Sequence, residues 1–293
     1  MRTKHLKLSL IVLALTSSCG EPPQPVDYDL VIRGGMVFDG NGNPGVVADV
    51  GINGDRIVTI GDIDGPGTRT IDASGLYVTP GFIDIHSHAD WLVPGADHGS
   101  LVEPFVRQGM TTLLGGNCGF SPAPITDNNL QAASDASQVI LDDAIDLRWK
   151  SMDGFLTALE EGGVAMNIAQ LVGHGAVRAA VKGHLDPTPP DAEALAAMER
   201  HTRAALEEGA IGSSTGLGYP PGIFAGHDEL AAFARWTADA GRLFTSHLRA
   251  YSATSGVYAD ENPRAHNLRA IDEILAVGRD SGVRLQILSL IHI

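Results

Sequence analysis

The stretch Pro80-Gly-Phe-Ile-Asp-Ile-His-Ser-His-Ala-Asp90 decides the fold of this chain. Its apolar residues 82–85 predict a buried strand, and two histidines, His86 and His88, follow directly. Side chains two residues apart in a strand point to the same side, so both imidazoles can reach one metal ion from the same direction. The stretch therefore predicts a strand that ends at the mouth of a metal-binding pocket.

From Leu76 onward, short apolar strands alternate with longer helical patterns. The predicted helices are 100–108, 152–161, 191–208, 229–240 and 267–280, each closed by a glycine suited to a left-handed helix end. A longer, more polar segment, 127–149, is predicted to be an insertion that contains a helix. The predicted strands are 77–85, 111–114, 166–172, 210–213, 243–246 and 283–287.

This alternation predicts an α/β fold with a parallel sheet. An open, doubly wound sheet is the alternative, but no glycine-rich phosphate loop follows the first strand. We therefore predict a metal-dependent hydrolase barrel of the TIM type, a (β/α) barrel spanning residues 76–287, with about six of the usual eight units. In front of it, the short strands and the Asn-Gly-Asp turn within 28–75 predict a small N-terminal β-sandwich domain.

Residues 1–18 have the layout of a secretory signal peptide. Three basic residues precede an apolar run, 8–15, that is too short to span a bilayer as a helix. Small residues then lead to Cys19, as in a bacterial lipoprotein cleavage box, and residues 19–27 form a proline-rich tether. We expect export, to the periplasm or outer membrane as a lipoprotein lipidated at Cys19. Thr16, where such boxes usually carry leucine, leaves ordinary signal cleavage as the alternative.

The last six residues, 288–293, have a second explanation besides a native strand end. Leu-Ser-Leu-Ile-His-Ile can be encoded as CTG TCT CTT ATA CAC ATC, a transposon-end adapter used in preparing sequencing libraries. We expect an adapter-derived artefact, with native sequence stopping near Ile287 and a barrel truncated at its C-terminal side. His292 is therefore not proposed as a ligand.

The composition limits the classes of partner. The chain of 293 residues is 44% hydrophobic and carries a formal net charge of −15. Such a surface repels phosphate backbones, so we expect no nucleic-acid partner, and membrane contact only through an N-terminal lipid anchor.

Polar side chains follow each of the first five predicted barrel strands. In a β/α barrel these strand ends open onto one face, where active sites are built. His86 and His88 follow the first strand, and a glycine-flanked Cys118 follows the second. The others are His174, Tyr219 and His247, after the third, fourth and fifth strands.

Each of these residues has a structural alternative. Cys118 is either an inert buried thiol or, because thiolate is a strong zinc ligand, part of a metal site with His86, His88 and His247. His174 is expected to orient substrate or support a ligand, and Tyr219 to cap a loop or bind a substrate carboxylate. The remaining histidines, at positions 98, 184, 201, 227 and 266, are expected to be solvated.

Three motifs, together with the first stretch, resemble the N-acyl-D-amino-acid deacylases (D-aminoacylases) of the amidohydrolase superfamily. They are Gly116-Asn-Cys-Gly119, Ser214-Thr-Gly-Leu-Gly-Tyr-Pro-Pro-Gly222 and Ser246-His-Leu-Arg249. The resemblance runs from about Tyr28 to Ile287. The cysteine motif together with the Gly-Leu-Gly-Tyr loop is the specific part, since most members of the superfamily use a carboxylated lysine where this group uses cysteine.

The resemblance implies that Cys118 and His247 hold a tightly bound zinc, with His86 and His88 flanking it in a weaker second site. It implies that Tyr219 contacts the α-carboxylate of an acylated amino acid. A further histidine and the general-base aspartate of the family would lie after Ile287. The expected reaction is therefore zinc-dependent hydrolysis of N-acyl-D-amino acids, with this chain alone inactive. The alternatives are a cyclic-amide hydrolase of the dihydroorotase or hydantoinase kind, and a non-catalytic lipoprotein that binds a metal or ligand.

Overall fold

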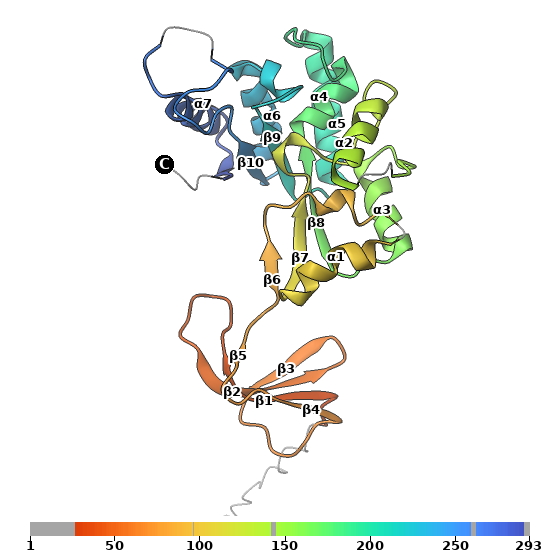
Figure 1. The fold of residues 1–293 in the computed structure, drawn as a ribbon, viewed down its shortest axis with the longest axis vertical. Coiled ribbons are helices and arrows are strands. Elements are labelled where there is room, and N and C mark those ends of the chain that lie inside the picture. The colour runs from red at the N-terminus through yellow and green to blue at the C-terminus, as the bar shows by residue number, and fades with distance from the viewer. Residues whose placement is uncertain (1–26, 96, 142–144, 259–261, 290–293) are drawn as a thin grey trace, which may run out of the picture. The chain divides into compact units, whose positions relative to one another are not determined.

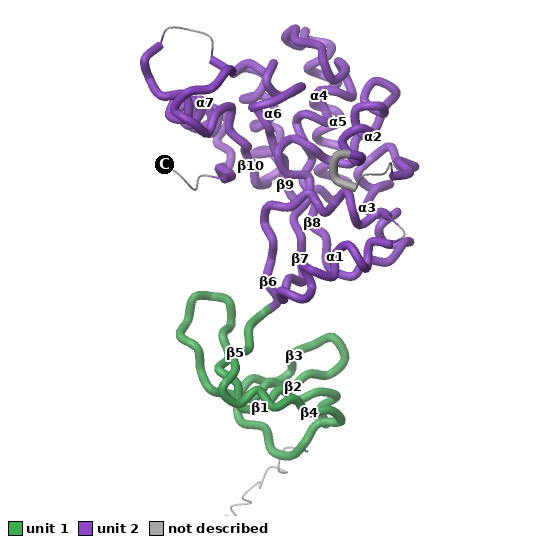
Figure 2. The backbone as a smooth tube through the Cα atoms, viewed as in Figure 1, with its two compact units in different colours: residues 1–80 green, residues 81–293 purple. Residues whose placement is uncertain are grey.

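The computed structural model describes residues 27–95, 97–141, 145–258 and 262–289 (Figure 1). The predicted signal peptide, the lipidation site Cys19 and most of the adapter-like tail lie outside the described residues. The chain divides into two compact units, residues 1–80 and 81–293 (Figure 2).

The described part of the first unit is one mixed β-sheet. Its strands are β1 (Leu30–Val37), β2 (Val46–Asn53), β3 (Arg56–Gly61), β4 (Arg69–Asp72) and β5 (Tyr77–Val78), in the order β3-β2-β1-β4, with β5 also on β1. The predicted hairpin is confirmed, because β2 and β3 pair antiparallel from Asn53 to Arg56. A sandwich was predicted, but the described residues form a single sheet. Strands β2 and β3 of this sheet expose apolar side chains such as Val47 and Ile57.

The second unit contains the predicted parallel sheet. Six strands follow one another in chain order from β6 to β11, and all neighbours pair parallel. They are β6 (Phe82–Asp84), β7 (Met110–Gly115), β8 (Asn167–Gly173), β9 (Gly212–Gly216), β10 (Leu243–His247) and β11 (Arg284–Ile287). This is the six-stranded part of a (β/α) barrel.

Helices connect the strands and cover the outside of the sheet (Figure 1). Apolar side chains of both layers, such as Val172 and Phe244 on strands and Phe155 and Phe233 on helices, form one fully buried core. The helices are α1 (His98–Arg107), α2 (Leu130–Leu141), α3 (Met152–Gly162), α4 (His174–Lys182), α5 (Ala192–Glu207), α6 (His227–Asp239) and α7 (His266–Ser281), with short 3-10 turns η1 (Ala89–Trp91), η2 (Asn117–Gly119) and η3 (Gly222–Phe224).

Two local predictions were wrong. The strand predicted at 77–85 is two strands: Tyr77–Val78 pairs with β1 in the first unit, and Phe82–Asp84 pairs with β7 in the second. Pro80 lies between them and has no amide hydrogen to donate to a sheet. The second difference is α4, which begins at His174, where no helix was predicted.

Candidate metal centre

The loop after β7 carries Cys118 in a left-handed backbone conformation. Cys118 has φ 58° and lies between Gly116 and Gly119, with φ 72° and 75°. A positive φ is uncommon for a residue with a side chain, and such strain gathers at functional sites. The thiol is 4% exposed.

Hydrogen bonds fix this loop on three sides. The Asn117 side chain donates to the carbonyl oxygen of Leu114 at 2.8 Å, and the Gly119 amide donates to Ser214 Oγ at 2.9 Å. The Tyr219 hydroxyl donates to the Cys118 carbonyl oxygen at 2.9 Å. These hydrogen bonds hold the loop above the ends of β8 and β9.

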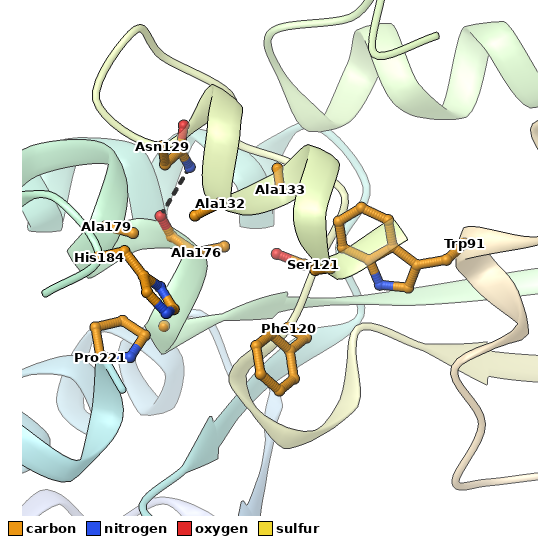
Figure 3. Close-up of a pocket in the computed structure, with 12 residues that line it drawn as sticks. Trp91, Phe120, Ser121, Asn129, Ala132, Ala133, Ala176, Ala179, His184 and Pro221 are labelled. Carbon is orange, nitrogen blue, oxygen red and sulfur yellow. Dashed lines mark hydrogen bonds between the residues drawn. The ribbon is translucent and has the colours of Figure 1, made fainter. Parts of the chain in front are cut away.

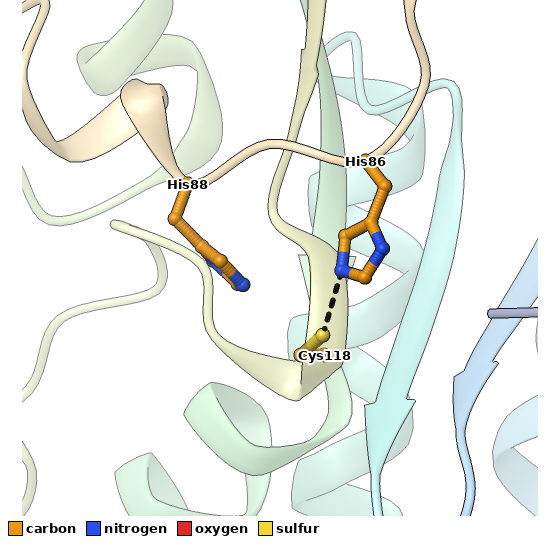
Figure 4. Close-up of side chains that lie close together, drawn as sticks. All are labelled: His86, His88 and Cys118. Carbon is orange, nitrogen blue, oxygen red and sulfur yellow. Dashed lines mark hydrogen bonds between the residues drawn. The ribbon is translucent and has the colours of Figure 1, made fainter. Parts of the chain in front are cut away.

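The nitrogen and sulfur donors expected from the sequence come together at this loop. Cys118 Sγ lies 3.1 Å from His86 Nε2 and 3.6 Å from His247 Nδ1. One donor atom each of His86, His88 and Cys118 lies within 4.8 Å of the others (Figure 4). His86 follows β6 and His88 precedes η1, so neither histidine lies within a strand. The two imidazoles are therefore brought together by the turn between the residues, and not by the alternation of side chains along a strand.

The donor set fits zinc. Thiolate and imidazole are its preferred protein ligands, and bonds of about 2.3 Å to sulfur and 2.0 Å to nitrogen place tetrahedral ligands about 3.5 Å apart. The two sulfur–nitrogen separations, 3.1 and 3.6 Å, lie close to that spacing. Cys118, His86, His88 and His247 are therefore the residues that would hold the metal.

Burial controls the protonation of these ligands. Burial lowers the pKa of His247 to about 4, with a smaller effect from the charges of His86 and His88. It also lowers the pKa of His86 and of His88. Burial raises the pKa of the Cys118 thiol to about 11. At neutral pH the imidazoles are therefore free to bind a metal, while the thiol must first lose its proton.

Asp90 binds the backbone of the cysteine loop through a hydrogen bond. Its Oδ2 accepts hydrogen bonds from the Gly116 amide at 2.7 Å and from Gln170 Nε2 at 2.9 Å. The carboxylate is 1% exposed, and burial raises its pKa to about 6. Asp90 therefore positions the loop that carries Cys118.

The two residues expected to contact substrate lie in different surroundings. Tyr219 stacks on Phe120, with ring centroids 5.1 Å apart, and lies 5.1 Å from the His247 ring. His174 is fully buried, and its Nε2 lies 2.8 Å from Glu229 Oε1. The structure thus brings Tyr219 to the metal centre and places His174 in a buried ion-pair cluster.

A cavity of about 500 Å³ opens beside the metal centre. His88, Phe120 and Tyr219 line it from one side, and Trp91 and His184 line it as well. A smaller space adjoins it and shares Trp91, Phe120 and His184 (Figure 3). The sequence reasoning missed Trp91 and Phe120, since apolar residues carry no chemical signal, and it expected His184 to be solvated.

Comparison with known proteins identifies relatives of this chain. The amidohydrolase family pattern matches residues 69–286. A D-aminoacylase of Alcaligenes xylosoxydans xylosoxydans is 37% identical over 258 residues, covering 87% of this chain and 49% of that protein. An N-acyl-D-glutamate deacylase of the same organism is 42% identical over 261 residues, covering 87% of this chain and 48% of that protein.

Solved structures give the same relationship. N-acyl-D-glutamate deacylase from Bordetella bronchiseptica, crystallised with zinc and a phosphonate inhibitor, superposes with a TM-score of 0.72 at 36% identity, covering 89% of this chain and 51% of that one. The chain thus spans about half the length of the relatives it matches. The fold, the cysteine-containing donor cluster and these matches together place the chain in the amidohydrolase family, in its D-aminoacylase group.

Proposed function

We propose that the protein carrying this chain hydrolyses the amide bond of N-acyl-D-amino acids, using zinc. The observation that carries the proposal is the Cys118 thiol among the imidazoles of His86, His88 and His247, at the carboxyl ends of parallel strands. The identity of 37% to a D-aminoacylase and 42% to an N-acyl-D-glutamate deacylase supports this choice of substrate.

Bound at these donors, zinc would polarise the scissile carbonyl and lower the pKa of a water molecule. The chain's own residues prepare the centre for that ion. The Cys118 loop is fixed by Asp90 and Tyr219 before any ligand arrives. Because little reorganisation remains, the centre is preorganised.

Tyr219 has a second task in the proposal. Burial, and then the neighbouring Cys118, raise the pKa of the Tyr219 phenol, so the hydroxyl keeps its proton. A neutral phenol at the edge of the cavity donates one hydrogen bond at a time. We propose that, when substrate binds, the Tyr219 hydroxyl stops donating its hydrogen bond to the Cys118 carbonyl oxygen and donates it to the substrate carboxylate.

The experiment measures amino-acid release by the product of the full gene. The zinc-loaded protein is incubated with N-acetyl-D-glutamate, N-acetyl-D-leucine and their L-enantiomers, and free amino acid is quantified by chromatography. We expect release from the D-substrates and loss of activity in Cys118→Ala. Bound zinc without release from any acylated D-amino acid would contradict the proposal and favour a metal-binding protein without catalysis.

A cyclic-amide hydrolase is the second enzymatic candidate. Enzymes of that kind usually bridge their metals with a carboxylated lysine, whereas this centre presents the thiol of Cys118. The same assay with hydantoin and dihydroorotate separates the two, since we expect neither ring to open.

Export as a lipoprotein is proposed on the N-terminal sequence alone. None of the helices in the described ranges has the length and apolar content needed to cross a bilayer. The proposed membrane attachment is a lipid on Cys19. Metabolic labelling with palmitate tests it, with Cys19→Ala as the unlabelled control.

A further inference from the structure

The cavity beside the metal centre has aromatic walls and an alanine-lined helix face. Phe120 connects it to the donor cluster, because its ring lies edge-on to His88 at 6.4 Å and stacks on Tyr219 with an interplanar angle of 15°. Across the cavity, Ala132 and Ala136 line the wall from α2. Residues four apart lie on the same face of a helix, so these methyl groups form one smooth surface.

The charge in this cavity is negative. Asp135, an exposed residue of α2, and His184 are the titratable residues besides His88 and Tyr219 that line it, and the lining set includes no lysine or arginine. Asp135 acts on His184 through its charge, opposing the effect of burial on the imidazole pKa. Apart from the hydroxyl of Tyr219, the lining therefore offers a substrate carboxylate no lysine or arginine, and Asp135 would repel it.

We propose that this cavity binds the acyl chain of the substrate and that Ala132 and Ala136 set the longest chain accepted. The proposal rests on the proposed function and adds its acyl specificity. In an N-acyl amino acid, the carboxylate and the side chain share one carbon on the nitrogen side of the scissile carbonyl. The acyl chain leaves from the other side and carries no charge, so it fits the part of the lining away from Tyr219, which has no lysine or arginine to hold an anion.

The volume agrees with a chain longer than acetyl. Ligand cavities of about 300–1,000 Å³ enclose most of a drug-sized molecule, and this one measures about 500 Å³. An acetyl group would leave most of the aromatic wall uncovered. Each further methylene that reaches the wall adds apolar burial, so affinity should rise with chain length.

The experiment measures binding to the zinc-loaded chain by calorimetry. The first series is N-acetyl-, N-hexanoyl- and N-decanoylglycine, which varies only the acyl chain. The second series is N-acetyl-glycine, -D-alanine and -D-leucine, which varies only the side chain. We expect affinity to rise roughly two- to fourfold per methylene in the first series, up to the full transfer energy of each group.

Ala136→Phe tests the wall itself. We expect this variant to bind N-acetylglycine as the parent chain does and to lose the gain between the hexanoyl and decanoyl probes. Gln138→Phe, an exposed position on the same helix, is the matched control and should keep that gain. Thermal unfolding checks that both variants fold. If Ala136→Phe does not fold, Ala132→Leu is used in its place.

The outcomes separate this inference from the proposed function. Equal affinity for all acyl lengths, or an effect of Ala136→Phe confined to the side-chain series, would overturn the acyl assignment while leaving hydrolysis intact. Length-dependent binding lost in Ala136→Phe supports the assignment even in a chain that turns over no substrate.

Discussion

Cys118 Sγ lies 3.6 Å from His247 Nδ1, although 129 positions separate the two residues. Their strands, β7 and β10, are not neighbours, since β8 and β9 lie between them in the sheet. The cysteine loop therefore reaches across the ends of two strands to bring its sulfur to the histidine. Because the loop passes so close to these strand ends, glycines, which have no side chain to collide with it, occupy the positions next to it.

Gly173→Ala should disturb the centre without touching a ligand. A Cβ at Gly173 would lie 2.3 Å from the carbonyl oxygen of Gly119, a backbone atom that cannot move alone. We expect a loss of about 1–3 kcal/mol in unfolding free energy and weaker zinc binding, measured by urea unfolding and chelator competition. Gly162→Ala, where a Cβ meets nothing within 4 Å, is the control. Equal zinc affinity in both variants would refute the crossing argument.

Asp90→Asn should change how stability depends on pH. The folded pKa of about 6 lies above the ordinary 3.8, so between these values the folded chain binds more protons than the unfolded chain. Stability contributed by the protonated carboxyl is therefore lost as pH rises through that range. Asparagine keeps an acceptor oxygen for Gly116 and Gln170 and carries no charge.

We expect Asp90→Asn to gain up to about 3 kcal/mol over the parent at pH 8, and little at pH 4. Urea unfolding of the metal-free chains at both pH values gives the comparison. A difference between variant and parent that is the same at pH 4 and pH 8 would show that Asp90 does not titrate as described.

Zinc binding should release one proton from the thiol. The pKa of Cys118 is about 11, whereas the pKa of each of the three histidines is lowered below its usual value. Between pH 7 and 9 the apparent zinc affinity should therefore rise about tenfold per pH unit. Chelator competition measures the slope, and Cys118→Ala should flatten it. A parent chain whose affinity is level over this range would mean that the thiol is not a ligand.

Glu229→Gln should destabilise the barrel while sparing the metal centre. Glu229 Oε1 lies 2.8 Å from His174 Nε2 and 3.0 Å from Arg178 Nε, and all three side chains are buried. Glutamine leaves the Arg178 charge without a counter-ion, so we expect a loss of about 3 kcal/mol in unfolding free energy. Zinc stoichiometry should not change.

The exposed pair of His227 and Asp280 provides the comparison. Asp280→Asn should cost less than about 1 kcal/mol, because solvent screens that pair. If Glu229→Gln lost zinc at unchanged stability, His174 would belong to the metal centre after all.

The order of the barrel strands could be predicted because most strands contain an apolar run and each of the five predicted helices has a closing glycine. The convergence of Cys118, His86 and His247 followed from the rule that parallel strand ends share one face. The division at Pro80 could not be predicted, because it depends on which strand each half of residues 77–85 pairs with. That pairing is set by tertiary structure and not by local sequence. Helix α4 has no side-chain cap at its start, and the prediction overlooked Gly183, which closes it.

The cavity was beyond prediction for a different reason. Trp91 and Phe120 look like ordinary core residues in sequence, and only the fold shows that they line a space beside His88. Asp90 was visible as a strand-end carboxylate, but its bonds to Gly116 and Gln170 join segments 26 and 80 residues away.

Zinc K-edge X-ray absorption of the zinc-loaded chain tests most directly whether the Cys118 sulfur and the strand-end histidines share one ion. The expected spectrum has one sulfur neighbour at about 2.3 Å with nitrogen neighbours at about 2.0 Å, and the sulfur shell disappears in Cys118→Ala. A parent spectrum with only nitrogen and oxygen neighbours would contradict the account.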